Sequence, residues 1–190
     1  MNTHEQQSDR ALFGFWLYIL SDCVLFAGLF ATFAVLRGAT FGGPTQEELL
    51  NLPYVLAETL LLLASSFAMG MALVMAQKNS AKAVLVALGC ALFLGWAFLG
   101  LEAHEFAGLI AAGTGPGKSA FMSAFFALVG VHGLHVAIGS LWILTMMGHA
   151  LLGISEKTST RLMMLGLFWH FLDIIWICIF TFVYLLGATL

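Results

Sequence analysis

The stretch 120–152, AFMSAFFALVGVHGLHVAIGSLWILTMMGHALL, decides the fold class of this chain. It contains no Asp, Glu, Lys or Arg, and it is longer than the roughly 20 residues that a helix needs to cross a hydrocarbon core of about 30 Å. The whole chain has the same character, because its 190 residues are 61% hydrophobic and only 9% charged. We therefore expect lipid to be the solvent of this protein.

Four further stretches have the length and composition of membrane spans, at 12–36, 54–76, 83–110 and 162–190. The segments between them hold glycines, prolines and charges, which indicate turns outside the hydrocarbon. The sequence thus predicts an all-α polytopic membrane protein, with five transmembrane helices in a single domain over 11–190. Residues 1–10 are polar and lack the features of a signal peptide, so we expect them to remain as a cytoplasmic segment.

The distribution of positive charge predicts the orientation, because cytoplasmic loops of membrane proteins are enriched in Lys and Arg. With the N-terminus inside, the inner side holds Arg10, Lys78, Lys82, Lys157 and Arg161. The outer side then holds only Arg37 and Lys118. We therefore expect an N-in, C-out topology.

Composition also limits the classes of function. The net charge of −3 comes without a basic cluster, so no nucleic-acid partner is indicated. Cys23, Cys90 and Cys178 lie inside apolar runs and are interpreted as buried small side chains, not as a metal or redox set. No internal repeat of the kind found in many secondary transporters is visible, which weakens a transporter interpretation without excluding it.

Tryptophan and small residues have simple structural interpretations. Trp16, Trp142, Trp169 and Trp176 are expected to be interfacial anchors, not a cofactor box. Small residues recur at helix-packing spacing, as at Ser66 and Gly70 and at Gly133 and Gly139. Such spacing permits close approach of neighbouring helices.

Ionisable side chains at membrane depth are the most informative residues, because each costs at least ~2.5 kcal/mol on insertion scales. Counting about 1.5 Å per residue puts Asp22 ~15 Å and Asp173 ~16 Å from the expected inner face, and His132 at a similar level. His135 and His170 lie one helical turn from His132 and Asp173, respectively. We expect these five side chains to form a mutual hydrogen-bond network among the first, fourth and fifth spans.

Three functions fit that central group. His132, His135, His170 and Asp173 could ligate a metal, although the repeated Glu-x-x-His pattern of di-metal bundles is missing. The group could also form a proton path, since Asp and His chains serve that purpose in pumps. In the third interpretation these residues only neutralise one another and hold the helices together. We favour this structural role and expect no metal.

A second polar group is expected near the outer face. It consists of Glu58 on the second span and of Glu102, His104 and Glu105 at the end of the third. Side chains near a helix end can reach water, so we expect this group to be partly hydrated.

Two segments resemble signature segments of subunit III of the haem-copper terminal oxidases. Residues 123–139 read SAFFALVGVHGLHVAIG and residues 168–184 read FWHFLDIIWICIFTFVY, similar to the HGLHV and WHFxDxxW motifs of that family. Residues 18–30, YILSDCVLFAGLF, are similar to its Ser-acid-x-x-x-F segment. The likeness covers nearly the whole chain from Phe13 onward.

Within that family, the five-helix length and the run Ser21-Asp22-Cys23 resemble the bacterial cytochrome bo-type ubiquinol oxidases. The mitochondrial cytochrome c oxidase subunit has seven helices, and cytochrome c oxidase members usually carry Glu at the position of Asp22. The alternatives are subunit III of a cytochrome c oxidase and an independent proton-coupled transporter. A membrane metalloenzyme is a third class.

The resemblance implies a chain without redox centres of its own in the bacterial inner membrane. It would contact subunit I, which holds the haems and copper, within a complex that also contains subunits II and IV. The resemblance further implies bound phospholipid, protection of the catalytic subunit during turnover, and sustained proton uptake by the complex.

Overall fold

The computed structural model of the protein describes residues 3–42 and 52–186, and all regular elements in these ranges are helices. The elements are α1 (Thr3–Leu36), α3 (Leu52–Gln77), α4 (Ala81–Ala111), α5 (Ala120–Leu151), α6 (Glu156–Ile179) and the π-helix η1 (Phe180–Leu185), which continues α6. Among the described residues, five helices are long and apolar enough to cross a membrane. This confirms the predicted all-α fold with five spans, and the chain is a multi-pass membrane protein.

Serine side chains cap the starts of α5 and α6. The Ser119 hydroxyl accepts a hydrogen bond of 3.1 Å from the Met122 amide at the start of α5. Ser155 accepts one of 3.2 Å from the Thr158 amide at the start of α6. For this reason α6 begins several polar residues before 162, where the hydropathy of the chain rises. Residues 187–190 of the predicted last span lie outside the described ranges.

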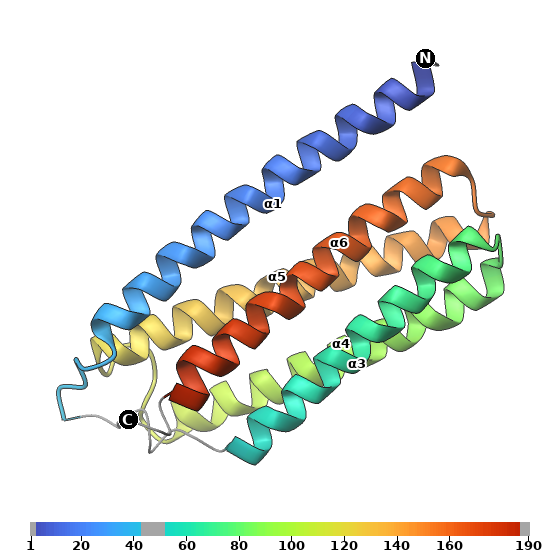
Figure 1. The fold of residues 1–190 in the computed structure, drawn as a ribbon. Helices are drawn as coiled ribbons and strands as arrows, with labels where there is room; N and C mark the ends of the chain where they lie inside the picture. The colour runs from blue at the N-terminus through green and yellow to red at the C-terminus, as the bar shows by residue number, and fades with distance from the viewer. Residues whose placement is uncertain (1–2, 43–51, 187–190) are drawn as a thin grey trace.

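The five helices run alternately up and down, as Figure 1 shows. The start of α1, the α3–α4 turn and the α5–α6 turn lie at one end of the bundle. Helices α5 and α6 occupy the middle, α3 and α4 pack together on one side, and α1 packs mainly against α5 on the other. Toward its N-terminus α1 diverges from the bundle.

The middle of the bundle packs around Trp169 on α6. A Cβ atom added at Gly95 of α4 or at Gly139 of α5 would lie only 2.9 Å from this indole ring, so both positions require glycine. The Trp169 indole N–H donates a hydrogen bond of 3.1 Å to the Ser65 hydroxyl. Trp169 is therefore a core residue with a polar partner, which corrects the expectation of an interfacial anchor.

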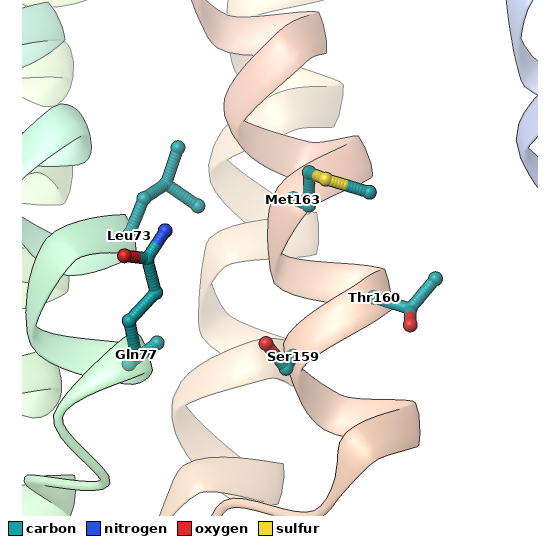
Figure 2. A pocket seen from close by; sticks show the side chains of 6 residues that line it. Leu73, Gln77, Ser159, Thr160 and Met163 are labelled. Carbon is teal, nitrogen blue, oxygen red and sulfur yellow. The ribbon is translucent and has the colours of Figure 1, made fainter.

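The seam between α3 and α6 is packed less tightly. Near the turns, a groove of about 300 Å³ opens between the two helices, lined by Gln77, Ser159 and Met163 among others (Figure 2). Farther along the seam Leu73 packs directly on Gly166, where an added Cβ would lie 2.7 Å from a leucine methyl group. Beyond that contact a second groove of about 510 Å³ reaches the middle of the helices.

Candidate functional site

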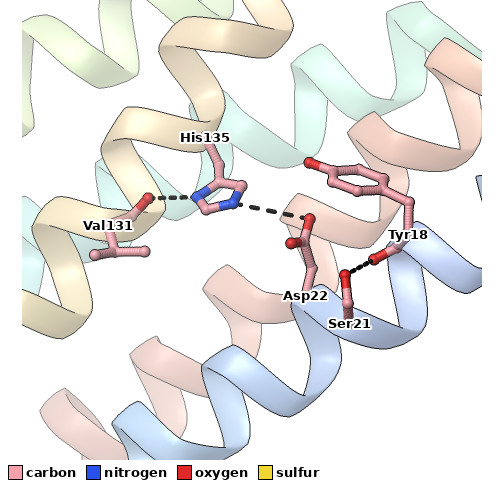
Figure 3. Close-up of polar contacts among 5 residues, drawn as sticks. All are labelled: Tyr18, Ser21, Asp22, Val131 and His135. Atoms are coloured by element: carbon pink, nitrogen blue, oxygen red, sulfur yellow. Dashed lines mark hydrogen bonds and ion pairs between the residues drawn. The ribbon is translucent and has the colours of Figure 1, made fainter.

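Asp22 on α1 and His135 on α5 face each other across the space between the two helices (Figure 3). Asp22 Oδ2 lies 3.8 Å from His135 Nε2, and both side chains are largely buried. His135 Nδ1 donates a hydrogen bond of 2.7 Å to the Val131 carbonyl oxygen. Because a carbonyl oxygen only accepts hydrogen bonds, Nδ1 of His135 carries a proton. Nε2 of His135 attracts Asp22 when a further proton is present, either on Nε2 or on the Asp22 carboxyl group.

His170 and Asp173 on α6 lie beside Ser66 of α3. The Ser66 hydroxyl and His170 Nδ1 are 2.7 Å apart, which is a short hydrogen bond. Asp173 interacts electrostatically with His170, its carboxyl group is hydrogen-bonded with the Ser66 side chain, and it lines the 510 Å³ groove together with both residues. Among the described residues, Asp173 Oδ1 has no hydrogen-bond partner.

His132 on α5 is fully buried among aromatic rings. Its imidazole stacks on Trp176 with ring centroids 5.2 Å apart, and it meets the edge of Phe98 at 5.8 Å. Phe26 of α1 packs against both His132 and His135. Neither nitrogen of His132 has a hydrogen-bond partner within the described part of the chain.

The five residues of the expected central network therefore do not form one mutual hydrogen-bond network. Asp22 pairs with His135, and His170 and Asp173 share contacts with Ser66. His132 packs among aromatic side chains and interacts only electrostatically with His135. The cause is that α5 and α6 each touch several neighbours, so residues one turn apart on one helix can meet different partners. The sequence identified a shared depth but not these partners.

Glu58, Glu102 and Glu105 form a carboxyl cluster between α3 and α4. Their side chains interact electrostatically with one another, and Glu105 accepts a hydrogen bond of 3.3 Å from the Tyr184 hydroxyl of η1. Glu58 is 0% exposed and Glu102 is 4% exposed, so the expectation of partial hydration was wrong for this isolated chain. His104 is exposed and does not belong to the cluster.

The burial of Glu102 depends on Gly133 of α5. An added Cβ at Gly133 would lie 2.8 Å from Glu102 Oε2 and 2.9 Å from its carboxyl carbon, so the carboxyl group lies directly over the glycine. The position of Glu102 near the end of its span suggested a hydrated location close to the membrane surface. Instead, α4 and α5 approach closely at Gly133, and Glu102 is buried inside the bundle.

Several polar contacts of these groups were missed in the sequence, among them the hydrogen bond that the Tyr18 hydroxyl donates to Asp22. Tyr184 reaches the carboxyl cluster from a π-helical turn, a feature that often occurs at functional sites. Thr59, next to Glu58, accepts a hydrogen bond of 3.1 Å from the Trp176 indole N–H, so Trp176 is a core residue too. Ser66 was noted for its helix-packing spacing with Gly70, but that spacing does not reveal its hydrogen bond with His170.

Within residues 3–42 and 52–186, no group of three or more His, Cys, Asp or Glu side chains is arranged to hold a metal ion. The three cysteines are free, and Cys23 and Cys90 are exposed on the outside of the bundle. The polar groups thus consist of paired or packed side chains rather than a convergent ligand set.

Comparison with known proteins adds the family. The family model described as cytochrome c oxidase subunit III matches residues 2–188. The chain belongs to the cytochrome c oxidase subunit III family. This confirms the resemblance seen in the HGLHV and WHFxDxxW segments, and it places Asp22, His135, His170 and Asp173 in a subunit III chain.

Relatives of this subunit III chain include quinol and cytochrome c oxidase proteins. It is 53% identical to cytochrome bo(3) ubiquinol oxidase subunit 3 of Pseudomonas aeruginosa, over 94% of this chain and 86% of the relative. It is 44% identical to the protein of that name in Buchnera aphidicola subsp. Schizaphis graminum, over 97% and 98%. It is also 44% identical to cytochrome c oxidase subunit 3 of Bacillus sp. PS3, over 92% and 84%.

Proposed function

We propose that this chain is the non-catalytic subunit III of a bo(3)-type ubiquinol oxidase in a bacterial inner membrane. The observation that carries the proposal is the 53% identity, over nearly the full length, to a protein named as subunit 3 of such an oxidase. Subunit I would hold the haems and copper and contact this chain directly, in a complex with subunits II and IV. The complex would oxidise quinol, reduce oxygen and pump protons.

The proposed role of this chain is to stabilise the catalytic subunit in the membrane. The Asp22–His135 pair links α1 to α5, and the Ser66–His170 hydrogen bond links α3 to α6. Interhelical polar contacts of this kind are worth roughly 0.6 kcal/mol on average and up to about 1.7 kcal/mol. They act as braces between helices, which fits a subunit without chemistry of its own.

Phospholipid is the proposed ligand, and the topology is proposed to be N-in, C-out. Helix α1 exposes apolar side chains such as Val24 and Val35. Acyl chains can cover such surfaces. Arg10, Lys78 and Lys157 are exposed at one end of the helices, where they would meet anionic head groups on the cytoplasmic side.

Deletion of this chain from the complex tests the role. We expect unchanged haem spectra and normal initial turnover of the remaining complex, followed by faster decay of activity during turnover. Loss of a haem or copper signal on deletion would contradict the proposal, because it would assign a redox centre to this chain.

A second candidate is subunit III of a cytochrome c oxidase, which the 44% identity to the Bacillus sp. PS3 protein favours. Purified complex distinguishes the two, since only one of the donors, ubiquinol or reduced cytochrome c, will support rapid oxygen consumption. An independent transporter, the remaining alternative, would purify alone or as a homo-oligomer instead of with a haem protein.

A further inference from the structure

The carboxyl cluster of Glu58, Glu102 and Glu105 places acids where no opposite charge compensates them among the described residues. Glu58 is 0% exposed and Glu102 is 4% exposed. The electrostatic interactions that act on these two groups come from other carboxyl groups of the cluster. A buried carboxylate needs an opposite charge or several hydrogen-bond donors, because the transfer of an isolated charge from water to an apolar interior is very costly.

The hydrogen-bond donors next to Glu58 are already used by other acceptors. The Tyr54 hydroxyl, one turn before it on α3, donates to the Leu101 carbonyl oxygen at 2.8 Å. The Thr59 hydroxyl donates to the Val55 carbonyl oxygen, also at 2.8 Å. As a result, neither carboxyl oxygen of Glu58 has a hydrogen-bond partner among the described residues.

Glu102 has a similar environment. Its Oε2 atom has no hydrogen-bond partner in the described part of the chain. Its carboxyl group lies directly over Gly133 of α5, so there is no space for water on that side. His132, the next ionisable side chain on α5, stacks on Trp176, and its electrostatic partner is His135 rather than a carboxyl group.

Glu105 differs from the other two acids of the cluster. It is only partly buried, and it accepts a hydrogen bond of 3.3 Å from the Tyr184 hydroxyl. It interacts electrostatically with both Glu58 and Glu102. It lies in the last two turns of α4, toward the end of the bundle opposite the start of α1 (Figure 1). Glu105 is therefore the carboxyl group of the cluster that is most accessible to water.

We propose that Glu58 and Glu102 form a proton-binding site, in which both carboxyl groups hold a proton at neutral pH, and that protons reach this site through Glu105. A neutral carboxyl group avoids the cost of a buried charge, and its O–H supplies the donor that the surrounding side chains do not offer. When one member of the pair has lost its proton, Glu105 donates its own proton to that carboxylate and takes up another from water. This site goes beyond the proposed function, because it consists of residues of this chain alone.

Infrared spectroscopy of the full-length chain in lipid bilayers tests the binding of protons. A protonated carboxyl group has a C=O stretching band that an ionised carboxylate lacks. We expect Glu58→Gln and Glu102→Gln each to remove part of this band at neutral pH, while glutamine preserves the shape of glutamate. Glu156→Gln is the control and should leave the band unchanged, because the polar segment 153–161 is expected outside the hydrocarbon. An unchanged band in both cluster variants would overturn the proposal.

The wild-type chain allows a second measurement that does not depend on the folding of a variant. When the chain is produced with glutamate that carries ¹³C in its side-chain carboxyl group, the band of a protonated glutamate moves to lower frequency. We expect this shift at neutral pH, and we expect the shifted band to disappear at alkaline pH. If no part of the band shifts, no glutamate of this chain holds a proton and the site does not exist.

Glu105→Gln tests the route of exchange. On transfer of the bilayers from H₂O to D₂O, the C=O band of the protonated pair shifts as deuterium replaces the proton. We expect this shift to be several-fold slower in the Glu105→Gln chain, because glutamine can accept the Tyr184 hydrogen bond but cannot relay a proton. His104→Gln, which changes an exposed neighbour, is the control and should leave the rate unchanged. Equal rates in the wild-type and Glu105→Gln chains would exclude Glu105 as the exchange group.

Discussion

The Asp22–His135 pair and the carboxyl cluster are two solutions to the same problem, an acidic side chain inside a membrane bundle. Asp22 lies opposite an imidazole on another helix, at 3.8 Å. Glu58 and Glu102 lie beside each other without a basic partner among the described residues, and Glu102 is pressed against Gly133. Asp22 is thus stabilised by an imidazole opposite it, whereas Glu58 and Glu102 are kept away from lipid by tight packing between helices.

This difference shows that depth along a span does not reveal how an acid is stabilised. Asp22 sits near the middle of α1 and is 7% exposed, whereas Glu58 sits near the start of α3 and is 0% exposed. We expect the stability of the Asp22 site to depend on His135 more than on the shape of the side chains. We expect the stability of the carboxyl cluster to depend on the packing of Glu102 more than on its charge.

Gly133→Ala should have the largest effect. The new methyl group would collide with the Glu102 carboxyl group, and overpacking of this kind costs about 1–3 kcal/mol. We expect the free energy of unfolding to fall by this amount in a detergent titration of the purified protein. Gly148→Ala on the same helix is the control, because no atom lies within 4 Å of its added Cβ. Equal effects of both substitutions would show that the carboxyl cluster does not depend on packing.

A double-mutant cycle with Asp22→Ala and His135→Ala should give the next largest effect. The pair faces across two helices, so its coupling free energy should be favourable and close to the ~0.6 kcal/mol average for interhelical polar contacts, with about 1.7 kcal/mol as the upper end. Unfolding free energies of the two single variants and the double variant provide the measurement. A coupling of zero would mean that the pair does not stabilise the α1–α5 contact.

The corresponding cycle with Glu58→Gln and Glu102→Gln should give a coupling of opposite sign. At an alkaline pH that ionises both buried carboxyl groups they repel each other, so the first substitution relieves repulsion and the second adds less. We expect a coupling free energy of roughly 0.5 kcal/mol, obtained from the unfolding free energies of the two single variants and the double variant. Because glutamine keeps the shape of glutamate, packing on Gly133 is retained. A favourable coupling, as in the Asp22–His135 pair, would remove the distinction between the two regions.

Tyr184→Phe should have the smallest effect. Its hydrogen bond to Glu105 is long, at 3.3 Å, and should contribute about 0.5 kcal/mol or less. Tyr54→Phe offers a comparison, because the Tyr54 hydroxyl donates to the Leu101 carbonyl oxygen at 2.8 Å. Thermal unfolding of the two variants should show the larger loss for Tyr54→Phe. The reverse order would indicate that Tyr184 holds the carboxyl cluster together.

Several features of the site were predictable and others were not. The approach of Asp22 to His135 follows the expectation that acids and imidazoles at one depth meet between the first and fourth spans. Hydration of Glu102 was inferred from its position near a helix end, and this failed because the residue faces Gly133. Trp169 was expected at an interface, whereas its ring fills the space between Gly95 and Gly139. In each failure the missing information was the direction in which a helix face points.

The sequence by itself determined that this is a membrane protein, and it predicted the five spans found among the described residues. Lipid contacts each apolar segment separately, so the number and type of spans depend only on the length and composition of each segment. Only the tertiary structure decided which polar side chains meet. The partner of a residue depends on the rotation and separation of whole helices, and these follow from packing at particular glycines such as Gly95 and Gly133.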